Sequence, residues 1–514
     1  MIRVLNVIQS FSLGGAARTV FGTSKYSSAP GKYHHLMVSL SPSMDDLEAC
    51  RVAEENGIEI HRPQTYGDLI RVVSESDIVL LHWWNNPELD HFIRMPLPAS
   101  RLAAWVHVGG HCDPQAVPDG LVSFLDFASA GSPYTHESAA FNQLSPCTRA
   151  AKTEMVYDAT DFSRLSSVTR VSHVGFNVGY IGTVDFQKMH PHYVRMSAAA
   201  AIPDVKFIVC GPGSEQETIQ REARALGREG SFDVRGMVHD ICPVLSTLDV
   251  YGYPLCEDNY AAAELNLQEV MYCGIPPVVF PYGGVKHLVT HDVTGYVVHT
   301  EREYAEALEH LYRCPADRER LGANAAEYAR KVFGAERAAE KFNLVLDRLM
   351  KSEKQTRPVF SPQSVAPEAM SEGARRFNDS LKSYRDLFAR SVASTGEKAL
   401  FSADAEIMQL SALMKRGGIK NYRRFYATDP FLCFWSGLVE LSEGDLVGAL
   451  NDFISALQNK FEHWRLWWYV AHIAHSLGNK ELTVASIGHL EQLAPRFEGL
   501  DALRRMAIGG GGAV

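Results

Sequence analysis

Short apolar runs alternate with amphipathic segments along the first 160 residues. The apolar runs are RVLNVIQ, HHLMVSLS, DIVLLHWW and LAAWVHV, and their length and composition are typical of buried strands. Between them lie AARTVFGTSKYSS, MDDLEACRVAEENG and YGDLIRVVSES, in which the apolar positions recur with the period of a helix. Strands that alternate with helices predict a parallel sheet covered on both faces.

The same alternation begins again after a polar join at Tyr157–His173. The second set of apolar runs is NVGYIGTV, VKFIVCG, FDVRGMV, DVYGYPL, PPVVFP and GYVVH. The chain is therefore predicted to hold two doubly wound, Rossmann-like α/β domains. Ligands of such domains bind in the crevice at the carboxyl ends of the strands, so we expect the functional residues there.

Beyond residue 300 the strand pattern fades. Residues 301–350 have helical periodicity, and Lys351–Gly373 is rich in Pro, Ser and charge, as linkers are. From Ala374 on, two segments align at an offset of 34 residues, with Trp435 on Tyr469. That period predicts a tetratricopeptide-like (TPR-like) all-helical domain, with a generic helical bundle as the alternative. The predicted domains are 1–165, 166–350, a linker 351–373 and the helical domain 374–508.

Composition and charge narrow the function classes. The 514 residues carry a formal charge of −10, which argues against nucleic-acid binding. Nine cysteines without a C-x-x-C pair fit a reducing compartment, and no apolar run is long enough to span a membrane. We expect a cytoplasmic protein, with peripheral membrane contact left open. The 20 histidines show no metal signature such as H-E-x-x-H, so no metal ion is expected.

Several glycine turns follow predicted strands. Gly14 and Gly15 lie between the first strand and the first helix, where backbone N–H groups can approach an anion. Gly182 ends the first strand of the second domain, and Lys188 follows within reach to neutralise a diphosphate. Gly211 and Gly236 occupy further turns of the same kind. Plain tight turns and a solvated lysine are the alternatives.

The segment YAAAELNLQEVMYCGIPPVVFPYGG, Tyr260–Gly284, combines a helix, a strand and a glycine turn. A helix is predicted over Glu264–Cys273. The loop before it, which includes Ala262 and Ala263, brings the N–H groups of the helix start into the crevice, where a diphosphate can bind. Glu269 can accept two ribose hydroxyls. Glu264 either contacts the ligand or complements the helix dipole.

His107 ends the fourth strand of the first domain, in AAWVHVGG. A neutral imidazole at a strand end can hydrogen-bond a sugar hydroxyl or a departing phosphate. The alternative is a core histidine. For His82, at the end of the preceding strand, we favour a structural role.

Taken together, these segments resemble the retaining glycosyltransferases with the GT-B fold, family 4. The resemblance covers residues 1–350. Its motifs are GGAART, DIVLLHWW, WVHVGG, SAGSPYTHE, VYDATDFSRL, GYIGTVDFQK, RGMVHDICPVLSTLDVYGYPL, QEVMYCGIPPVVFPYGG and ERLGANAAEYARKVFGAERAAEKF. The last of these resembles the closing helices that cross back to the first domain.

The resemblance implies a donor such as a UDP- or GDP-sugar, bound mainly by the second domain without a metal or cofactor. Glu269 takes the place of the family's ribose-binding glutamate and Lys188 that of its diphosphate lysine. His107 takes that of the histidine near the transferred sugar, and the Gly14–Gly15 turn approaches the diphosphate from the first domain.

The chain also departs from the family pattern. The family's first glutamate stands eight residues before the second, and here that position is Ala261. Either Glu257 or Glu264 is expected to replace it. Thr183 stands where an arginine is usual, and Arg235 is a candidate replacement for the missing cation.

Three functions follow from these observations. The leading one is a retaining hexosyltransferase-like enzyme with a glycan, lipid-linked or small-molecule acceptor, in which residues 374–508 mediate partner binding or self-association. The alternatives are a catalytically silent scaffold that acts through the helical domain and a nucleotide-sugar epimerase.

Overall fold

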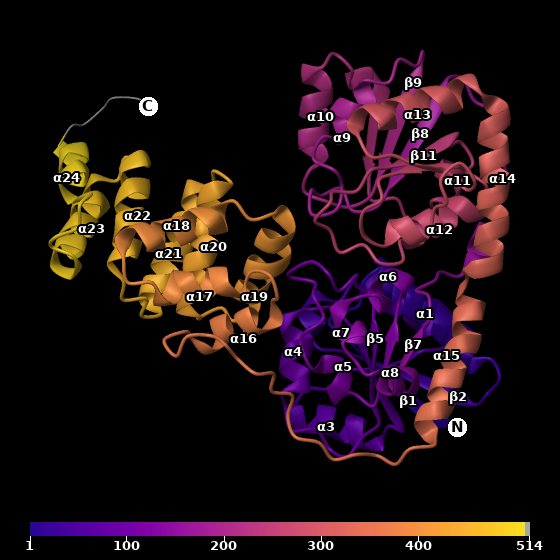
Figure 1. Ribbon diagram of the computed structural model, residues 1–514, viewed down its shortest axis with the longest axis horizontal. Coiled ribbons are helices and arrows are strands. Elements are labelled where there is room, and N and C mark those ends of the chain that lie inside the picture. Colours follow the sequence, from indigo (N-terminus) through magenta and orange to yellow (C-terminus); the bar gives the residue numbers. More distant parts are fainter. Residues whose placement is uncertain (509–514) are drawn as a thin grey trace. The chain divides into compact units, whose positions relative to one another are not determined.

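The computed structural model of the chain describes residues 1–508. It divides into two compact units, Met1–Pro362 and a second unit that begins at Gln363. The first unit holds two α/β lobes and the second is helical, so the predicted fold class is confirmed (Figure 1). The boundary between the units falls inside the predicted linker 351–373.

Lobe 1 is built on a seven-stranded sheet in the order β3-β2-β1-β4-β5-β6-β7. Every recorded strand pair in it is parallel. Its strands are β1 (Ile2–Ile8), β2 (Tyr33–Ser39), β3 (Glu59–His61), β4 (Ile78–Trp83), β5 (Leu102–Val106), β6 (Phe127–Ala130) and β7 (Thr153–Met155). Its helices are α1 (Gly15–Ser28), α2 (Leu47–Glu55), α3 (Tyr66–Glu75), α4 (Pro87–Ile93), α5 (Leu121–Phe124), α6 (Pro133–His136), α7 (Ala139–Asn142) and α8 (Pro146–Lys152).

Lobe 2 is built on a six-stranded parallel sheet in the order β10-β9-β8-β11-β12-β13. Its strands are β8 (Phe176–Ile181), β9 (Val205–Cys210), β10 (Phe232–Gly236), β11 (Val250–Tyr253), β12 (Pro277–Val279) and β13 (Tyr296–Val297). Its helices are α9 (Tyr193–Ala198), α10 (Gln216–Ala225), α11 (Cys242–Leu245), α12 (Leu265–Tyr272), α13 (Glu301–Arg313) and α14 (Pro315–Val332), and a 3₁₀ turn, η2 (Phe162–Leu165), precedes the lobe.

The last helix of the first unit returns to lobe 1. After α14, the helix α15 (Ala335–Met350) runs along lobe 1 (Figure 1). Its residues Phe342 and Leu346 are buried against strand residues such as Val4 and Trp105. The crossing helices expected from the sequence are therefore present, and they tie the two lobes into one compact unit.

The first part of the predicted linker is fastened to lobe 1. Gln355 pairs with Ser100 in an isolated bridge, and the Phe360 N–H donates to the Ile93 carbonyl at 3.1 Å. The Phe360 ring is buried in the same core cluster as Trp83 and Phe92. Chain up to this point therefore belongs to the first unit.

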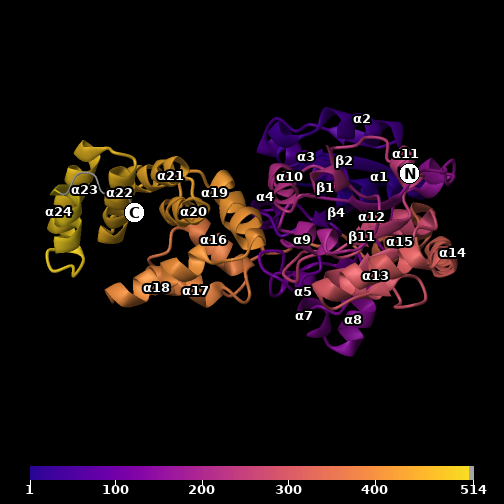
Figure 2. The ribbon, with the colours of Figure 1, turned by 90° about the horizontal axis from the view of Figure 1, so that it is seen from above.

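The second unit contains pairs of helices with a regular spacing. It comprises α16 (Glu372–Ser380), α17 (Arg385–Ala393), α18 (Glu397–Met408), the π-helical η5 (Leu413–Lys420), α19 (Asn421–Phe425), α20 (Pro430–Ser442), α21 (Leu446–Gln458), α22 (Trp464–Ser476), α23 (Lys480–Leu493) and α24 (Leu500–Ile508). Helices α20 and α22 begin 34 residues apart, as do α21 and α23. A Cβ at Gly437 would lie 2.6 Å from the Phe453 ring, so the small residue permits close packing of α20 on α21 (Figure 2). The predicted helical domain is confirmed; its TPR-like identity stays a prediction.

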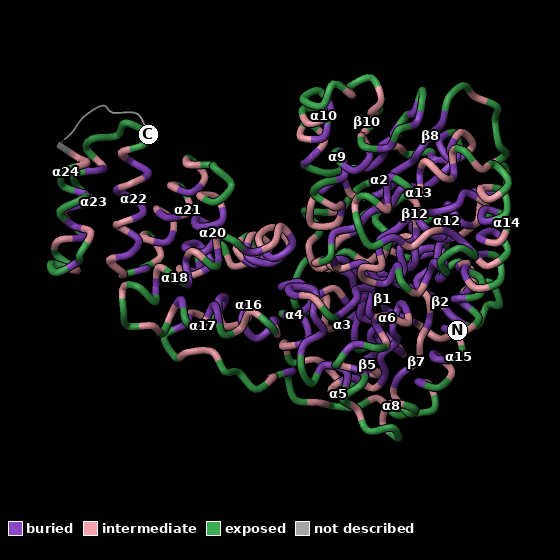
Figure 3. The backbone as a smooth tube through the Cα atoms, turned by 45° about the horizontal axis from the view of Figure 1, so that its top comes forward, coloured by how far each residue is buried: buried purple, intermediate pink, exposed green. Residues whose placement is uncertain are grey.

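Most residues of the central strands β1, β4, β5, β8 and β11 are buried, as the apolar runs predicted, and buried segments run through both lobes (Figure 3). Within residues 1–508, none of the helices combines the length and the hydropathy that a membrane crossing requires.

Candidate functional site

The loop before α12 is built by two close backbone contacts. The Asn259 Oδ1 accepts from the Ala261 N–H at 2.8 Å, and the Gly284 N–H donates to the Ala261 carbonyl at 2.9 Å. A Cβ at Gly284 would lie only 1.6 Å from the Ala262 carbonyl oxygen, so a side chain there would force the two segments apart. The glycine turn that follows β12 therefore holds the loop at the start of α12 in place.

Glu264 is the N-terminal cap of α12 and has an unusual backbone conformation. Its φ is 42° and its ψ is 72°, in the left-handed region that non-glycine residues rarely adopt. Its carboxylate is buried, accepts from the Tyr253 hydroxyl and lies 2.9 Å from the Lys188 Nζ. Left-handed conformations of this kind concentrate at functional sites. Glu264 is thus more than a neutraliser of the helix dipole.

Lys188 bonds to Glu264 and lies near two aromatic rings. Its Nζ lies 5.9 Å from the Tyr253 ring centre and 5.6 Å from that of Tyr260. Burial is the largest single influence and lowers the pKa of Lys188. The charge of the Glu264 carboxylate, the influence of Tyr260 and the hydrogen bond to Glu264 together outweigh it, so the pKa is raised. Lys188 is therefore a firmly protonated cation.

Glu269, in the middle of α12, has two arginine partners from other parts of the unit. Its Oε1 accepts from the guanidinium of Arg18 on α1 and from that of Arg164 on η2. Burial, together with the positive charge of Arg164, lowers the pKa of Arg18 to about 9. Arg18 also donates to the Thr160 hydroxyl at 3.1 Å. Two cations thus share one carboxylate, and the cluster has an excess positive charge.

The start of α12 also contacts lobe 1 through its own side chains. The Gln268 Nε2 donates to the Asp158 carbonyl at 2.8 Å. A Cβ at Gly15 would meet the Leu265 side chain at 3.6 Å, so the predicted Gly14–Gly15 turn faces the start of α12. The structure therefore brings this turn close to the helix that carries Glu264 and Glu269.

Three other predicted turns adjoin one another in lobe 2. The Gly211 N–H donates to the Gly236 carbonyl at 2.7 Å, and a Cβ at Gly211 would lie 1.7 Å from the Gly182 carbonyl oxygen. The Thr183 carbonyl accepts from the Tyr180 hydroxyl at 2.9 Å. These turns lie side by side at the carboxyl ends of β8, β9 and β10, as the sequence predicted.

Other candidate residues lie elsewhere. Glu257 is exposed, whereas Glu264 is buried against Lys188, so only Glu264 contacts the predicted diphosphate lysine. Arg235 pairs with Asp233 of the same strand at 2.7 Å. Arg18 and Arg164 are the cations that reach α12, and they lie within the quoted motifs GGAART and VYDATDFSRL. Neither arginine was predicted as a site residue, although membership in these motifs was a signal that could have identified both.

His107 is buried, and both ring nitrogens bond within the protein. Its Nδ1 lies 2.8 Å from the Asp158 Oδ1, and its Nε2 lies 2.9 Å from the His82 Nδ1. The side chain is 0% exposed. The expected hydrogen bond from His107 to a sugar or phosphate therefore has no free ring nitrogen here, because buried polar groups take their partners from the protein.

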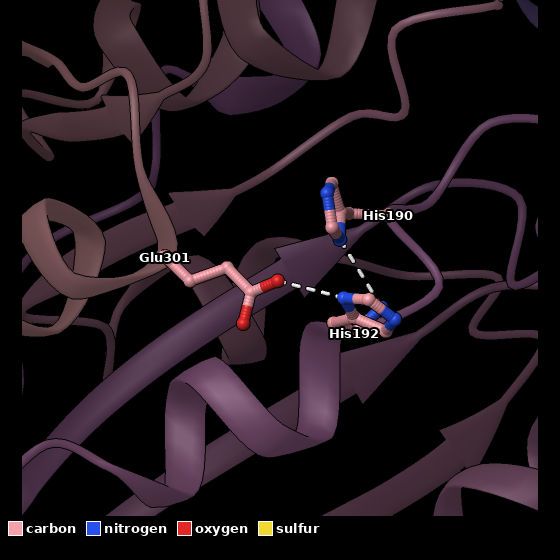
Figure 4. Close-up of side chains that lie close together, drawn as sticks. All are labelled: His190, His192 and Glu301. Carbon is pink, nitrogen blue, oxygen red and sulfur yellow. Dashed lines mark hydrogen bonds and ion pairs between the residues drawn. The ribbon is translucent and has the colours of Figure 1, made fainter.

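Two clusters in lobe 2 have metal-ligand chemistry, and one of them comprises His310, Cys314 and Asp317. The other involves Glu301. His190, His192 and Glu301 place ligand atoms within 4.8 Å of one another (Figure 4). The His192 Nδ1 lies 2.7 Å from the Glu301 Oε1, but the Arg195 guanidinium donates to both Glu301 oxygens at 2.8 Å. The cluster's carboxylate already holds a cation, so we assign no metal ion to it.

Comparisons with known proteins agree with the lobe 2 geometry. Residues 176–328 match the family described as "Glycosyl transferases group 1". The chain is 30% identical over 179 residues to the alpha-maltose-1-phosphate synthase of Mycolicibacterium smegmatis, covering 32% of this chain and 44% of that protein. It is 27% identical over 152 residues to the alpha-D-kanosaminyltransferase of Streptomyces kanamyceticus, covering 29% and 39%. The matches thus span less than half of each relative.

Solved structures extend the likeness to both lobes. The crystal structure of Anabaena HepE in complex with UDP-glucose superposes with a TM-score of 0.55 over 68% of this chain and 100% of that one. The identity is 18%, so this likeness concerns the fold. Residues 176–328 therefore carry the sequence pattern of the group 1 glycosyl transferases, and they do so within a two-lobed GT-B fold.

Proposed function

We propose that the chain is a retaining glycosyltransferase that moves a sugar from a nucleotide-diphosphate sugar to a glycan, lipid-linked or small-molecule acceptor. The observation that supports this most is the charge around α12, at its N-cap Glu264 and at Glu269 in its middle. There Arg18 and Arg164 share the single carboxylate of Glu269, while Lys188 is balanced by Glu264. An excess cation beside the N-terminus of a helix favours a bound anion.

In this proposal each charged residue has a role in binding the donor. Glu269 accepts the ribose hydroxyls, and Lys188 binds the diphosphate. Arg18 and Arg164 supply the positive charge that is missing at position 183, where Thr183 stands in place of the usual arginine. Glu264, which contacts Lys188, replaces the family's first glutamate and contacts the transferred sugar. A donor phosphate oxygen helps to deprotonate the acceptor, so the protein contributes positioning and stabilisation of the departing diphosphate.

The ion pairs also suggest how the side chains change partners when a donor binds. Each acidic side chain at the start of α12 is bound to a cation of the protein. A diphosphate competes for Lys188 and the two arginines, which releases the carboxylates toward the hydroxyls of the ribose and sugar. Binding and rearrangement of these side chains are then one event.

A second candidate function is the catalytically silent scaffold that acts through the helical unit. It is favoured by the same ion pairs, because both carboxylates of the site, Glu264 and Glu269, already have cationic partners within the protein. Binding of a partner through residues 374–508 is part of both proposals.

A thermal-shift panel with UDP-, GDP- and ADP-sugars separates the two. A ligand that binds only the folded chain raises the melting temperature according to its affinity. We expect one nucleotide class to do so in the wild type and in the control Lys206→Met, but not in Lys188→Met. No shift with any donor, and no slow donor hydrolysis, would favour the scaffold.

Retention and metal independence are tested on the reaction itself. NMR of the first-formed product should show the same anomeric configuration as the donor, and EDTA should leave the rate unchanged. Inversion of the anomeric centre would refute retention. Sugar interconversion without an acceptor would instead indicate the epimerase.

A further inference from the structure

A chain of hydrogen bonds crosses the sheet of lobe 1 from α1 to the segment after β7. Asn6, His82 and His107 stand two residues after Val4, Leu80 and Trp105, respectively. Side chains two residues apart in a strand point to the same face, so these members lie on the sheet face that α15 covers. The members are Ser27 on α1, His35 on β2, Asn6 on β1, His82 on β4, His107 after β5 and Asp158 after β7. All six residues are buried, so each of their polar atoms must find its hydrogen-bond partner within the protein.

Asn6 sets the direction of every bond in the chain. Its Nδ2 donates to the Leu36 carbonyl at 2.9 Å, which fixes the orientation of the amide because a carbonyl only accepts. The Asn6 Oδ1 therefore faces the His82 Nε2, at 2.9 Å. An amide oxygen also only accepts, so the His82 Nε2 must be protonated.

The same reasoning makes His35 neutral. The second Asn6 Nδ2 hydrogen points to the His35 Nδ1 at 3.2 Å, so that nitrogen accepts. The His35 Nε2 then donates to the Ser27 hydroxyl at 3.0 Å, and Ser27 donates to the Asn343 Oδ1 at 2.6 Å. Burial lowers the pKa of His35 to about 3, in agreement with this assignment.

On the His82 side of Asn6, the hydrogen bonds need one more proton than neutral imidazole rings can supply. The bonds from His82 to Asn6, from His82 to His107 and from His107 to Asp158 need three protons. Two neutral imidazoles bring one proton each, and an ionised carboxylate brings none. One further proton must be present. Without it two lone pairs would face each other, either between the two rings at 2.9 Å or between the His107 Nδ1 and the Asp158 Oδ1 at 2.8 Å.

The position of the extra proton follows from the charges. Burial, and next the charge of His107, hold the pKa of His82 well below its usual value, so His82 stays neutral. His107 lies next to the only carboxylate in the chain of bonds. We propose that Asp158 is a positioning residue that holds His107 as an imidazolium, so that lobe 1 places a buried positive charge at the end of β5.

This assignment changes the role expected for His107, and here it rests on the proposed function. Both ring nitrogens are engaged, so His107 acts on a donor through its charge and not through a hydrogen bond. Asp158 also connects that charge to the donor site, because its carbonyl accepts from Gln268, the residue before Glu269. The titratable side chains within the chain of bonds are His35, His82 and Asp158.

The test is the protonation state of His107 in the full chain labelled with ¹⁵N in its histidine rings. At pH 7.5 NMR should show protons on both ring nitrogens of His107. In Asp158→Asn the new amide can donate to the His107 Nδ1, so all bonds are made with neutral rings, and one ring proton should disappear. The control Asp161→Asn removes a carboxylate that pairs with Lys25, and it should leave His107 doubly protonated.

A singly protonated His107 in the wild type, or a doubly protonated one in Asp158→Asn, would overturn the proposal. If the variants do not fold, neutron diffraction of the wild-type chain shows whether deuterons lie on both nitrogens. Under the proposed function, kcat for donor hydrolysis should fall about tenfold in Asp158→Asn with KM little changed, as expected when one interaction in the transition state is lost. The expected ring protons with no turnover in any variant would refute the proposed function alone.

Discussion

Two carboxylates of the chain meet arginine in different ways. In the helical unit, Asp404 on α18 pairs with Arg465 on α22 at 2.8 Å, and their side chains are 0% and 1% exposed. In the α/β unit, Glu269 is 2% exposed, but its partners Arg18 and Arg164 are 24% and 37% exposed. One pair is balanced and closed to water; the other has a surplus cation that water reaches.

The difference separates a structural ion pair from one that can exchange partners. Arg465 also donates to the Ser391 carbonyl at 2.9 Å, and the Tyr469 hydroxyl donates to Asp404 at 3.0 Å, so both members of the pair have further partners inside the unit, although the buried Arg465 Nε has none. Removal of one member of such a pair leaves an uncompensated buried charge. At Glu269, by contrast, an incoming anion can replace the carboxylate as a partner of either guanidinium.

The largest expected effect follows from the closed pair. Arg465→Met leaves the Asp404 carboxylate buried without its cation, which should lower the free energy of unfolding of the helical unit by about 3–5 kcal/mol. Denaturant titration followed by tryptophan fluorescence measures this, since four of the seven tryptophans lie in that unit.

Two controls decide whether charge is the cause. The double variant Arg465→Met/Asp404→Leu removes both charges and should recover most of the loss. Arg504→Met breaks an exposed pair with Glu491 and should change the stability by less than about 1 kcal/mol. Equal losses in the single and double variants would point to packing.

Lys188 lies between the two extremes, because its pair with Glu264 is balanced but belongs to the proposed site. Lys188→Met should lower the transfer rate by about 10²–10³-fold, or about 2.7–4 kcal/mol, the range found when one donor to a developing charge is removed. Lys206→Met is the matched control on β9. A large loss of stability with an unchanged transfer rate per folded molecule would show that Lys188, like Arg465, belongs to a structural ion pair.

The closed pair should also give the helical unit a distinctive pH dependence. Burial raises the pKa of Asp404 to about 6, against the opposing charge of Arg465. Its folded pKa thus exceeds the unfolded value of 3.8, so the associated stability is present below pH 3.8 and is lost as the pH rises through about 6. Two pKa units correspond to about 3 kcal/mol.

Burial lowers the pKa of the neighbouring His463 to about 4, which gives the opposite slope in the same pH range. The measurement is therefore the difference in unfolding free energy between the wild type and Asp404→Asn from pH 4 to 7. As the pH rises, the wild type should lose stability relative to Asp404→Asn. A flat difference would show that Asp404 is ionised throughout.

The sequence predicted the parts of the fold that periodicity determines. The α/β alternation, the helical C-terminal region and the return of α15 all follow from apolar spacing or from motif resemblance, and lobe 2 was the clearest because its glycine turns end consecutive strands. The linker was less predictable. Its composition suggests free chain, but Phe360 is buried in lobe 1, and a single apolar residue in a polar segment gives no periodic signal.

The site was predictable by position but not by pairing. Lys188 and Glu264 were singled out because they follow a strand or start a helix, and Glu269 because it lies on the helix that Glu264 starts. Their partners were not, since Arg18 and Arg164 are separated from Glu269 by 251 and 105 residues. The sequence also contained no sign that Glu264, with its left-handed backbone, pairs with Lys188.

The smallest effect sharpens the comparison most, because Glu269 has two proposed roles that one variant can separate. Glu269→Gln replaces the carboxylate, which would accept both ribose hydroxyls, with a neutral amide that has one acceptor oxygen, and it removes the charge that pairs with Arg18 and Arg164. If Glu269 binds ribose, affinity for the nucleoside diphosphate should fall by about 1.5–3 kcal/mol, the value of a hydrogen bond to a charged group. Inorganic pyrophosphate has no ribose, and its affinity should stay level or rise, because both guanidiniums lose their competing carboxylate. Calorimetric titration of both ligands into the wild type and Glu269→Gln measures the two effects. Equal losses for both would mean that Glu269 only positions the arginines, and the cluster would then resemble the Asp404 pair.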